Sequence, residues 1–339
     1  MVAAAVHPAV FSCYGILMTL VSIPENPAPQ GTIEAQIRAA DGVRLRVARW
    51  APKAPRRGTV AIFGGRGEFI EKYFEVADDI LSRGFTAAIL DWRGQGGSDR
   101  ALRNVHKGHV DDFSHYLRDL DAFSNAILAP QCPRPWFALA HSLGAAILLI
   151  AAEAGRCPFD RLVLTSPMIA VKGVDHHGCA RYLLEFLDGL GLGGAFAPGQ
   201  GSGTLWTKPF DGNPLTSDPA RFARISKLVA AAPQLVLGGT TVGWANAAFR
   251  TMRRFDEPNF PRRIETPALV IASGADRVTD TRAAERFASR LRAGRIVVIE
   301  GAEHEILIER DVFRNQFWAA FDEFVTRAHP PGLEGRRAA

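Results

Sequence analysis

The chain has 339 residues, of which 47% are hydrophobic and 22% are charged, so it has enough apolar material for a large globular core. Its formal net charge is +5, with 40 basic residues against 35 acidic ones and no dense run of lysine and arginine. This pattern argues against a nucleic-acid partner, while the mild basic excess leaves open a transient contact with an anionic membrane surface. The four cysteines form no CxxC pair, which favours free thiols and a cytoplasmic protein, with membrane-peripheral placement as an alternative.

The N-terminal residues 2–21 are largely apolar, but polar residues and a proline interrupt them and no basic residue precedes them. A spanning helix needs about 20 clean apolar residues, and a signal peptide needs a basic start and a small-residue cleavage site. Three interpretations stay open: a biological start at Met18 with residues 1–17 absent or disordered, a peripheral anchor, or a signal sequence. No other stretch is apolar enough to span a membrane.

The next segments predict a sheet that starts with a hairpin and continues with buried parallel strands. Two alternating segments, 32–39 and 43–50, flank Asp41-Gly42, a strong hairpin signal. From residue 58 onwards, short continuous apolar runs alternate with amphipathic helical segments, which is typical of strands buried on both faces of a mostly parallel sheet. We expect such strands at 59–63, 86–90, 136–140, 161–165, 267–272 and 295–300. Their repetition predicts an α/β fold with helices on both faces of the sheet.

The strand–helix alternation stops between about 168 and 255 and then resumes. This region contains the glycine-rich stretches GLGLGGAF and GQGSG, together with helix-like pieces. An insertion that interrupts a regular repeat is usually functional, so we interpret it as a lid over one end of the sheet. The predicted organisation is an N-terminal extension and linker (1–31), a first core part (32–167), a lid (168–255), a second core part (256–328) and a disordered tail (329–339).

The motif that carries chemistry is Ala140-His141-Ser142-Leu143-Gly144, between an apolar run and a helical run. A serine at a sharp strand-to-helix turn projects its hydroxyl above the sheet as a nucleophile. Ala140 and Gly144 are small, which lets the turn approach neighbouring backbone closely. The following helix directs its N-terminal dipole at the site and favours negative charge.

A serine nucleophile needs a general base, and the base needs a carboxylate that orients it. Asp276 and His304 each follow directly after a predicted strand, in the chain order serine, acid, histidine. Asp280 is the nearest rival acid, although it falls at the start of the next helix. His141 adjoins the nucleophile, but its side chain points elsewhere from the turn. We therefore predict a catalytic triad of Ser142, Asp276 and His304.

The oxyanion of the tetrahedral intermediate needs preorganised N–H donors. One is predicted to be the backbone N–H of Leu143, directly after the nucleophile, and the other that of Arg66 in the loop after the first parallel strand. Gly65 and Gly67 flank Arg66 and permit close backbone approach. This loop matches no nucleotide-binding pattern. In the later loop DWRGQGGS, Asp91 and Arg93 are expected to form an internal ion pair with a structural role.

With these residues placed, the sequence resembles bacterial lysophospholipases and monoacylglycerol-lipase-like α/β-hydrolases. The resemblance rests on GGRGEFIEKYFEVADDILSRGF, DWRGQGGSDR, AHSLGA, GADRV and GAEHEIL, and it spans about residues 32–328. It implies an α/β-hydrolase fold, a serine-esterase mechanism without cofactor, and a lid before the acid residue. The chain departs from the family where Gly64 replaces a frequent histidine and Ala140 replaces a glycine.

We therefore interpret the chain as a serine hydrolase that cleaves carboxylic esters through an acyl-enzyme, as a lysophospholipase or monoacylglycerol lipase does. The expected partner is a small-molecule or lipid substrate, with no metal, no cofactor and no obligate protein partner. Two alternatives stay open. One is a small-ester hydrolase or peptidase on the same fold, because fold does not settle substrate. The other is a non-catalytic binding protein.

Overall fold

The structure is a computed structural model that describes residues 19–53 and 57–326. The expectations for residues 1–17 and for the tail 329–339 fall outside these ranges. Within them, no helix combines the length and the apolar character that crossing a membrane requires.

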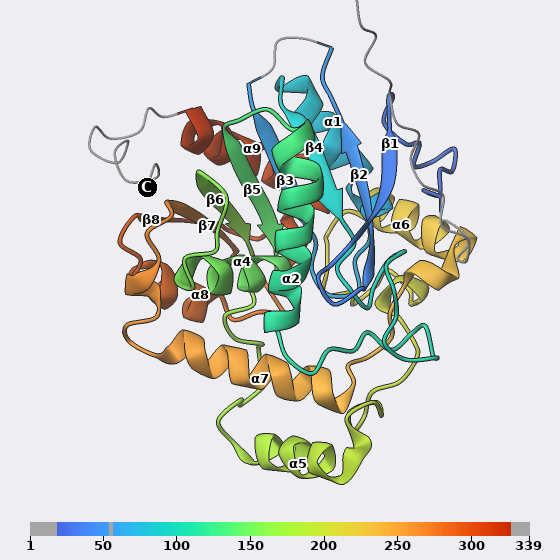
Figure 1. The fold of residues 1–339 in the computed structure, drawn as a ribbon, viewed down its shortest axis with the longest axis vertical. Helices are drawn as coiled ribbons and strands as arrows, with labels where there is room; N and C mark the ends of the chain where they lie inside the picture. Colours follow the sequence, from blue (N-terminus) through green and yellow to red (C-terminus); the bar gives the residue numbers. More distant parts are fainter. Residues whose placement is uncertain (1–18, 54–56, 327–339) are drawn as a thin grey trace, which may run out of the picture.

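The described residues form one central sheet with the strand order β1-β2-β4-β3-β5-β6-β7-β8 (Figure 1). Strand β2 runs antiparallel to both of its neighbours, and all other neighbouring strands are parallel. The strands are β1 (Ile33–Arg38), β2 (Arg44–Trp50), β3 (Thr59–Phe63), β4 (Thr86–Leu90), β5 (Trp136–His141), β6 (Arg161–Thr165), β7 (Ala268–Ser273) and β8 (Gly294–Ile299). The predicted hairpin and all six predicted parallel strands are confirmed, with ends shifted by at most one residue.

Helices cover both faces of the sheet because its inner strands alternate between two cores. In β3, Ala61 and Phe63 pack into one core and Val60 and Ile62 pack into the other, because successive side chains of a strand point to opposite faces. The predicted α/β fold with helices on both faces is confirmed. These helices are α1 (Phe74–Ser82), α2 (Ser114–Phe123), the short α3 (Ala129–Gln131), α4 (Leu143–Glu153), α8 (Thr281–Ala288) and α9 (Asp311–Thr326).

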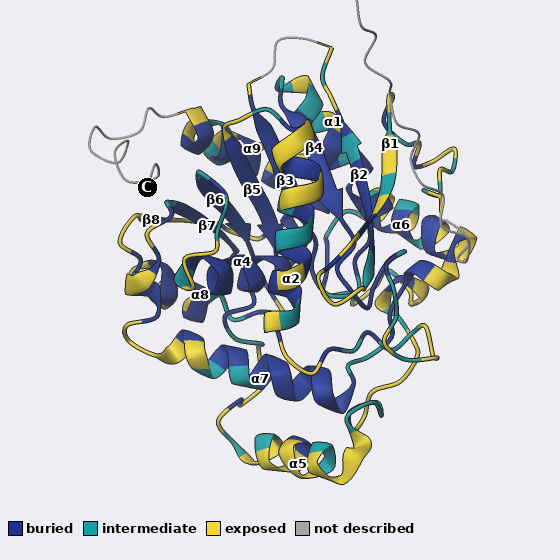
Figure 2. Cartoon of the chain, viewed as in Figure 1, coloured by how far each residue is buried: buried dark blue, intermediate teal, exposed yellow. Residues whose placement is uncertain are grey.

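Three helices interrupt the alternation between β6 and β7: α5 (Cys179–Leu187), α6 (Pro219–Ala231) and α7 (Val242–Asp256). Figure 1 shows α7 lying across one end of the core, with α5 beyond it and farthest from the sheet. One face of α5 packs on α7 through Leu184, Phe249 and Met252. Most of α5 is exposed, in contrast to α7 (Figure 2). The inserted segment therefore has one part that packs on the core and one part that projects from it.

Candidate active site

Ser142 occupies a sharp turn between β5 and α4. Its backbone has φ 49° and ψ −110°, a conformation that L-residues rarely adopt. The turn is held in place because the Ser142 N–H donates to the Thr165 carbonyl at 3.0 Å, while the Ser142 carbonyl accepts from Ala146 and Met168 at 3.1 Å each. A strained residue that the surrounding structure holds firmly is characteristic of a functional position.

The residues on either side of the turn explain why small side chains are needed there. An added Cβ on Gly144 would lie 2.4 Å from the Phe63 carbonyl oxygen and 2.7 Å from that of Gly64, so only glycine fits. Ala140 is fully buried in β5, between β3 and β6. The close approach brings the first turn of α4 against the end of β3.

His304 and Asp276 form a buried hydrogen-bonded pair at the ends of β8 and β7. His304 Nδ1 lies 2.9 Å from Asp276 Oδ2. The Asp276 carboxylate also accepts hydrogen bonds from the Val278 N–H, the Thr279 N–H and the Thr279 hydroxyl, at 2.7 to 2.8 Å. Asp280, the rival acid, instead caps α8 by accepting from the Ala283 N–H at 3.0 Å.

These contacts shift the pKa values of both partners toward their charged forms. Burial lowers the pKa of His304, but the hydrogen bond and charge of Asp276 outweigh burial and raise it above 6.5. Burial raises the pKa of Asp276, but the hydrogen bond and charge of His304 outweigh it and lower this pKa below 3.8. The imidazole is thus oriented by its Nδ1 contact, which leaves Nε2 as the nitrogen for proton transfer.

The imidazole of His304 is also placed close to the turn that carries Ser142. Its ring packs against the ring of His141, the residue before Ser142, with centroids 4.7 Å apart. The Ser166 hydroxyl donates to the His304 carbonyl at 2.8 Å and fixes the backbone there. The three residues predicted as a triad thus follow the parallel strands β5, β7 and β8 at the same edge of the sheet, as ligand-binding residues in open α/β sheets do.

In the loop after β3, the backbone N–H groups on either side of Arg66 are bound by side chains of the protein. The Gly65 N–H donates to Glu68 Oε2 at 2.5 Å, and the Gly67 N–H donates to Gln95 Oε1 at 3.2 Å. Within the described ranges, the N–H groups of Arg66 and Leu143 make no hydrogen bond. These are the two donors that the sequence predicts for an oxyanion hole.

Comparison with known proteins places this geometry in a family. A family model described as serine aminopeptidase, S33, matches residues 54–311. The chain belongs to the S33 family of α/β-hydrolases. It is 32% identical over 319 residues to lysophospholipase L2 of Escherichia coli K12, with 88% of each chain covered. It is also 31% identical over 130 residues to monoglyceride lipase of Rattus norvegicus, covering 38% of this chain and 41% of that one.

Solved structures show the same fold. A soluble variant of monoglyceride lipase from Saccharomyces cerevisiae superimposes with a TM-score of 0.69 at 20% identity, covering 88% of this chain and 97% of that one. Monoacylglycerol lipase of Paleococcus ferrophilus gives a TM-score of 0.64 at 22% identity, covering 84% and 99%. The predicted resemblance and the predicted α/β-hydrolase fold are confirmed, and this S33 hydrolase is an ester hydrolase of the lysophospholipase and monoglyceride-lipase type.

A buried ionic cluster supports the site of this S33 hydrolase, and the sequence interpretation missed it. Lys72 Nζ lies 2.8 Å from Glu68 Oε1 and 2.6 Å from Glu305 Oε2. Glu68 also accepts from the Tyr73 hydroxyl and, as above, from the Gly65 N–H. The cluster therefore connects the loop of Arg66 with the residue that follows His304. Glu68 and Glu305 lie inside the quoted motifs GGRGE and GAEHE, which was the available signal.

The charge states in this cluster are set by burial and by Lys72. Although burial opposes it, the Lys72 ammonium keeps the pKa of Glu68 below its usual range. Burial and the Glu68 carboxylate raise the pKa of Glu305 to about 7. Burial lowers the pKa of His141 to about 3, so this ring is neutral at neutral pH. Glu68, His141 and Glu305 approach one another as metal ligands could, but the Lys72 ammonium already bridges the two carboxylates.

The expected ion pair between Asp91 and Arg93 is wrong. Asp91 pairs with Arg46 at 2.6 Å, while Arg93 pairs with Asp119 and Asp41 at 2.7 Å each. Side chains two residues apart along an extended or turning backbone point in different directions, so each finds a partner on another element. The structural role expected for this loop fits its contacts.

Two other side chains of the same loop hold the backbone around Arg66. The Gln95 amide donates to the Gly65 carbonyl at 2.8 Å, and its oxygen accepts from Gly67. The Trp92 indole donates to the Gly64 carbonyl at 3.1 Å. The loop after β4 thereby fixes the geometry of the loop after β3.

Proposed function

We propose that this hydrolase cleaves the ester of a single-chain lipid, a lysophospholipid in the first place, with Ser142, His304 and Asp276 as its catalytic triad. The observation that carries the proposal is the strained turn of Ser142 beside the buried His304–Asp276 pair and two unused N–H groups. The extended similarity to a protein named lysophospholipase L2, which covers 88% of both chains, supports the substrate class.

In the proposed acylation step, His304 Nε2 takes the proton of the Ser142 hydroxyl as its oxygen attacks the ester carbonyl. The N–H groups of Leu143 and Arg66 donate to the oxyanion, and removing one such donor typically costs about 3 kcal/mol of barrier lowering. His304 then gives the proton to the leaving alcohol. Asp276 holds the imidazole tautomer and stabilises its charged form.

In the proposed deacylation step, water replaces the alcohol. His304 removes a proton from this water, the resulting hydroxide attacks the acyl-enzyme, and the fatty acid leaves as Ser142 recovers its proton. The same two N–H groups serve both tetrahedral intermediates, and the proposed reaction uses no metal or cofactor. Lys72, Glu68 and Gln95 act as positioning residues because they hold the loop that presents the Arg66 N–H.

We assign residues 168–255 the role of a lid whose outer helix touches the lipid surface. Helix α5 and the turn after it expose Tyr182, Phe186 and Leu190 at 60%, 63% and 60%. Such large apolar side chains gathered on one projecting element favour contact with a membrane or micelle. The cytoplasmic location stays a prediction from the cysteine pattern.

The proposal is tested by the hydrolysis of p-nitrophenyl esters of increasing chain length, lysophosphatidylcholine and a monoacylglycerol. We expect wild-type activity to favour the lipids and long-chain esters, and Ser142→Ala to abolish release and fluorophosphonate labelling. Ser289→Ala, at an exposed position directly after α8, serves as the matched control. Full esterase activity in Ser142→Ala would refute the mechanism. Failure of the wild type to label would instead favour a binding protein.

A peptidase is the second candidate because the family model carries the description serine aminopeptidase. Aminoacyl p-nitroanilides test it in the same assay. If Ser142-dependent release occurs from these anilides and not from any lipid ester, the lipid substrate is wrong while the triad is retained.

A further inference from the structure

A cavity of about 550 Å³ adjoins the proposed oxyanion hole and has no assigned role. The loop after β3 forms one wall through Arg66, and the inserted segment forms the opposite wall. None of the three triad residues lines the cavity. It adjoins the proposed site through Arg66, whose N–H is the proposed oxyanion donor, and through Glu305, the neighbour of His304. A group bound in this cavity would therefore belong to the same substrate molecule as the ester.

Arg66 brings a positive charge to this cavity without a carboxylate partner. Its Nη1 and Nη2 donate to the carbonyls of Gly238 and Gly239 at 3.0 and 2.7 Å, and its guanidinium lies 4.9 Å from the Trp244 ring centroid. Within the described ranges, Arg66 forms no ion pair, and its Nε, shielded from solvent, makes no hydrogen bond. Burial lowers the pKa of Arg66 to about 10, so it stays charged at neutral pH.

The remaining charges of the cavity leave it positive overall. Lys208 lines its wall and is exposed. The carboxylates of Glu68 and Glu305 also line it, but both are bound to the buried ammonium of Lys72. Two cations and two carboxylates line the cavity, and the Lys72 ammonium behind its wall makes the local balance positive. Burial and the Glu68 carboxylate also raise the pKa of Glu305 to about 7, which lowers its negative charge near neutral pH. An anionic ligand group fits this balance better than a neutral one.

The glycine-rich stretch GQGSG provides the opposite wall of this cavity. Gly199, Gly201 and Gly203 line it, and an added Cβ on any of them would meet no atom within 4 Å. At these positions no side chain stands between the backbone and the open space beside it. Bare backbone beside a guanidinium is suited to binding phosphate oxygens, which accept several hydrogen bonds at once.

We propose that this cavity is a subsite for the head-group phosphate of a lysophospholipid, with Arg66 as its main ligand and Lys208 at its mouth. This proposal rests on the proposed function, because it gives a binding site to the phosphate of the alcohol that leaves in that reaction. In a lysophospholipid only the glycerol backbone separates the phosphate from the ester. Arg66 could contact both groups of such a substrate, because its backbone N–H is the proposed oxyanion donor and its side chain lines the cavity. A guanidinium binds phosphate through paired, charge-assisted N–H groups, whereas its hydrogen bonds to an uncharged glycerol lack the attraction between opposite charges.

The test compares kcat/KM for lysophosphatidylcholine and for a monoacylglycerol with the same acyl chain. We expect Arg66→Met to lower the ratio of the two constants about tenfold or more, and Lys208→Met to lower it about threefold, since charge-assisted contacts differ in strength with burial. Arg292→Met, at an exposed position before β8, is the matched control and leaves the ratio unchanged. An unchanged ratio in both cavity variants, with Ser142-dependent hydrolysis of both lipids, overturns the subsite and leaves the ester hydrolase standing.

A binding measurement separates the two proposals when turnover is lost. Calorimetry of Ser142→Ala with glycerophosphocholine, with glycerol and with inorganic phosphate reports on the cavity alone. We expect glycerophosphocholine to bind, glycerol not to bind, and Lys208→Met to weaken the binding of glycerophosphocholine. Such binding without hydrolysis of any lipid would retain the subsite and reject the proposed function. Inorganic phosphate binding as tightly as glycerophosphocholine, or no binding of either, would overturn the head-group assignment.

Discussion

At the scale of single residues, the proposed chemistry depends on the contact through which Asp276 orients the imidazole of His304 and raises its pKa. Its carboxylate is saturated with donors, three from Val278 and Thr279 and one from the imidazole. A carboxylate fixed in this way cannot rotate away from Nδ1, so it determines the tautomer of His304 as well as its pKa. In the proposed mechanism the general base is the neutral imidazole, so we expect activity to fall when His304 becomes protonated.

This gives a prediction for the pH profile of kcat/KM. In the wild type the acidic limb should lie above pH 6.5, because Asp276 raises the pKa of His304. Asp276→Asn removes the main cause of that rise, so the limb should move to lower pH while kcat falls roughly 10⁴-fold through the wrong tautomer. Asp280→Asn is the control: it weakens the cap of α8 but leaves the limb in place. If Asp280→Asn moved the limb and Asp276→Asn did not, Asp280 would be the acid of the triad.

The placement of the proposed triad residues follows from the sequence because each of them comes directly after its own buried strand. Strand ends in a parallel sheet lie together, so order and position along the chain were sufficient to choose Asp276 over Asp280. The supporting cluster could not be predicted in the same way. Lys72 and Glu305 are separated by 233 positions, and a buried lysine between two glutamates has no periodic signature. The pairing of Asp91 was predicted wrongly for the same reason, since its partner Arg46 lies on β2, 45 positions away.

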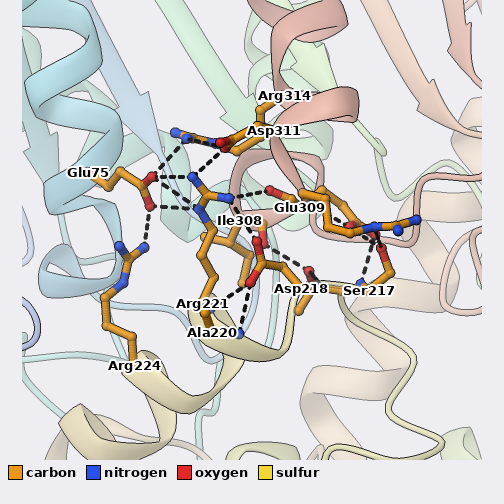
Figure 3. A network of polar contacts seen from close by, with 12 residues as sticks. Glu75, Ser217, Asp218, Ala220, Arg221, Arg224, Ile308, Glu309, Asp311 and Arg314 are labelled. Carbon is orange, nitrogen blue, oxygen red and sulfur yellow. Dashed lines mark hydrogen bonds and ion pairs between the residues drawn. The ribbon is translucent and has the colours of Figure 1, made fainter.

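At the scale of elements, a network of ion pairs fastens α6 of the inserted segment to α1 and α9 of the core (Figure 3). Its centre is Glu75 on α1, whose carboxylate contacts Arg221 and Arg224 of α6 and Arg314 of α9. Burial would raise the pKa of Glu75, but the hydrogen bond from Arg221 and the charges of Arg314 and Arg224 outweigh it and lower the pKa to about 2. One carboxylate thus joins three helices.

We therefore expect Glu75→Gln to lower the free energy of unfolding by about 1.5–3 kcal/mol, the range for hydrogen bonds to charged groups. The folded-state pKa is depressed, so the wild-type contribution is present above pH 4.5 and disappears as the pH falls toward 2. Urea titrations at pH 7 and pH 3 measure this, and the variant should approach the wild type at pH 3. Glu285→Gln, exposed on α8, is the control. An equal loss at both pH values would contradict the electrostatic origin.

The core elements were predictable together with their packing, whereas the helix-like pieces expected in the inserted segment were predictable without their packing. A continuous apolar run between helical segments has one interpretation, whereas α5, α6 and α7 are amphipathic helices whose apolar faces could pack on several surfaces. Only the fold shows that Asp218 caps α6 and that Arg221 then reaches Glu75, 146 positions away. Irregularity in the sequence therefore predicts that a segment is inserted between β6 and β7, but it does not predict how that segment is attached to the core.

At the scale of the whole molecule, the inserted segment is held unevenly. Its α6 part is clamped to the core by charged contacts, and α7 lies buried against it, whereas α5 contacts mainly α7 (Figures 1 and 2). The least anchored helix is also the one that exposes the largest apolar side chains. Contact with a lipid surface would cover those side chains, and α5 could shift there without disturbing the clamp. Binding to lipid and opening of the site would then be one event.

This arrangement predicts that a substitution on α5 lowers the hydrolysis of lipid at a membrane surface but not the hydrolysis of a dissolved ester. Phe186→Asp should weaken partition onto vesicles of neutral lipid about tenfold, since burying a phenylalanine side chain contributes roughly 1.5–3 kcal/mol. Hydrolysis of lipid presented in those vesicles should fall in parallel, while hydrolysis of a short, soluble p-nitrophenyl ester should change little. Val312→Asp, at an exposed position of α9, introduces the same charge away from α5 and is the matched control. If both variants lose vesicle binding equally, net charge rather than α5 governs the contact; if neither does, α5 is not the surface that meets lipid.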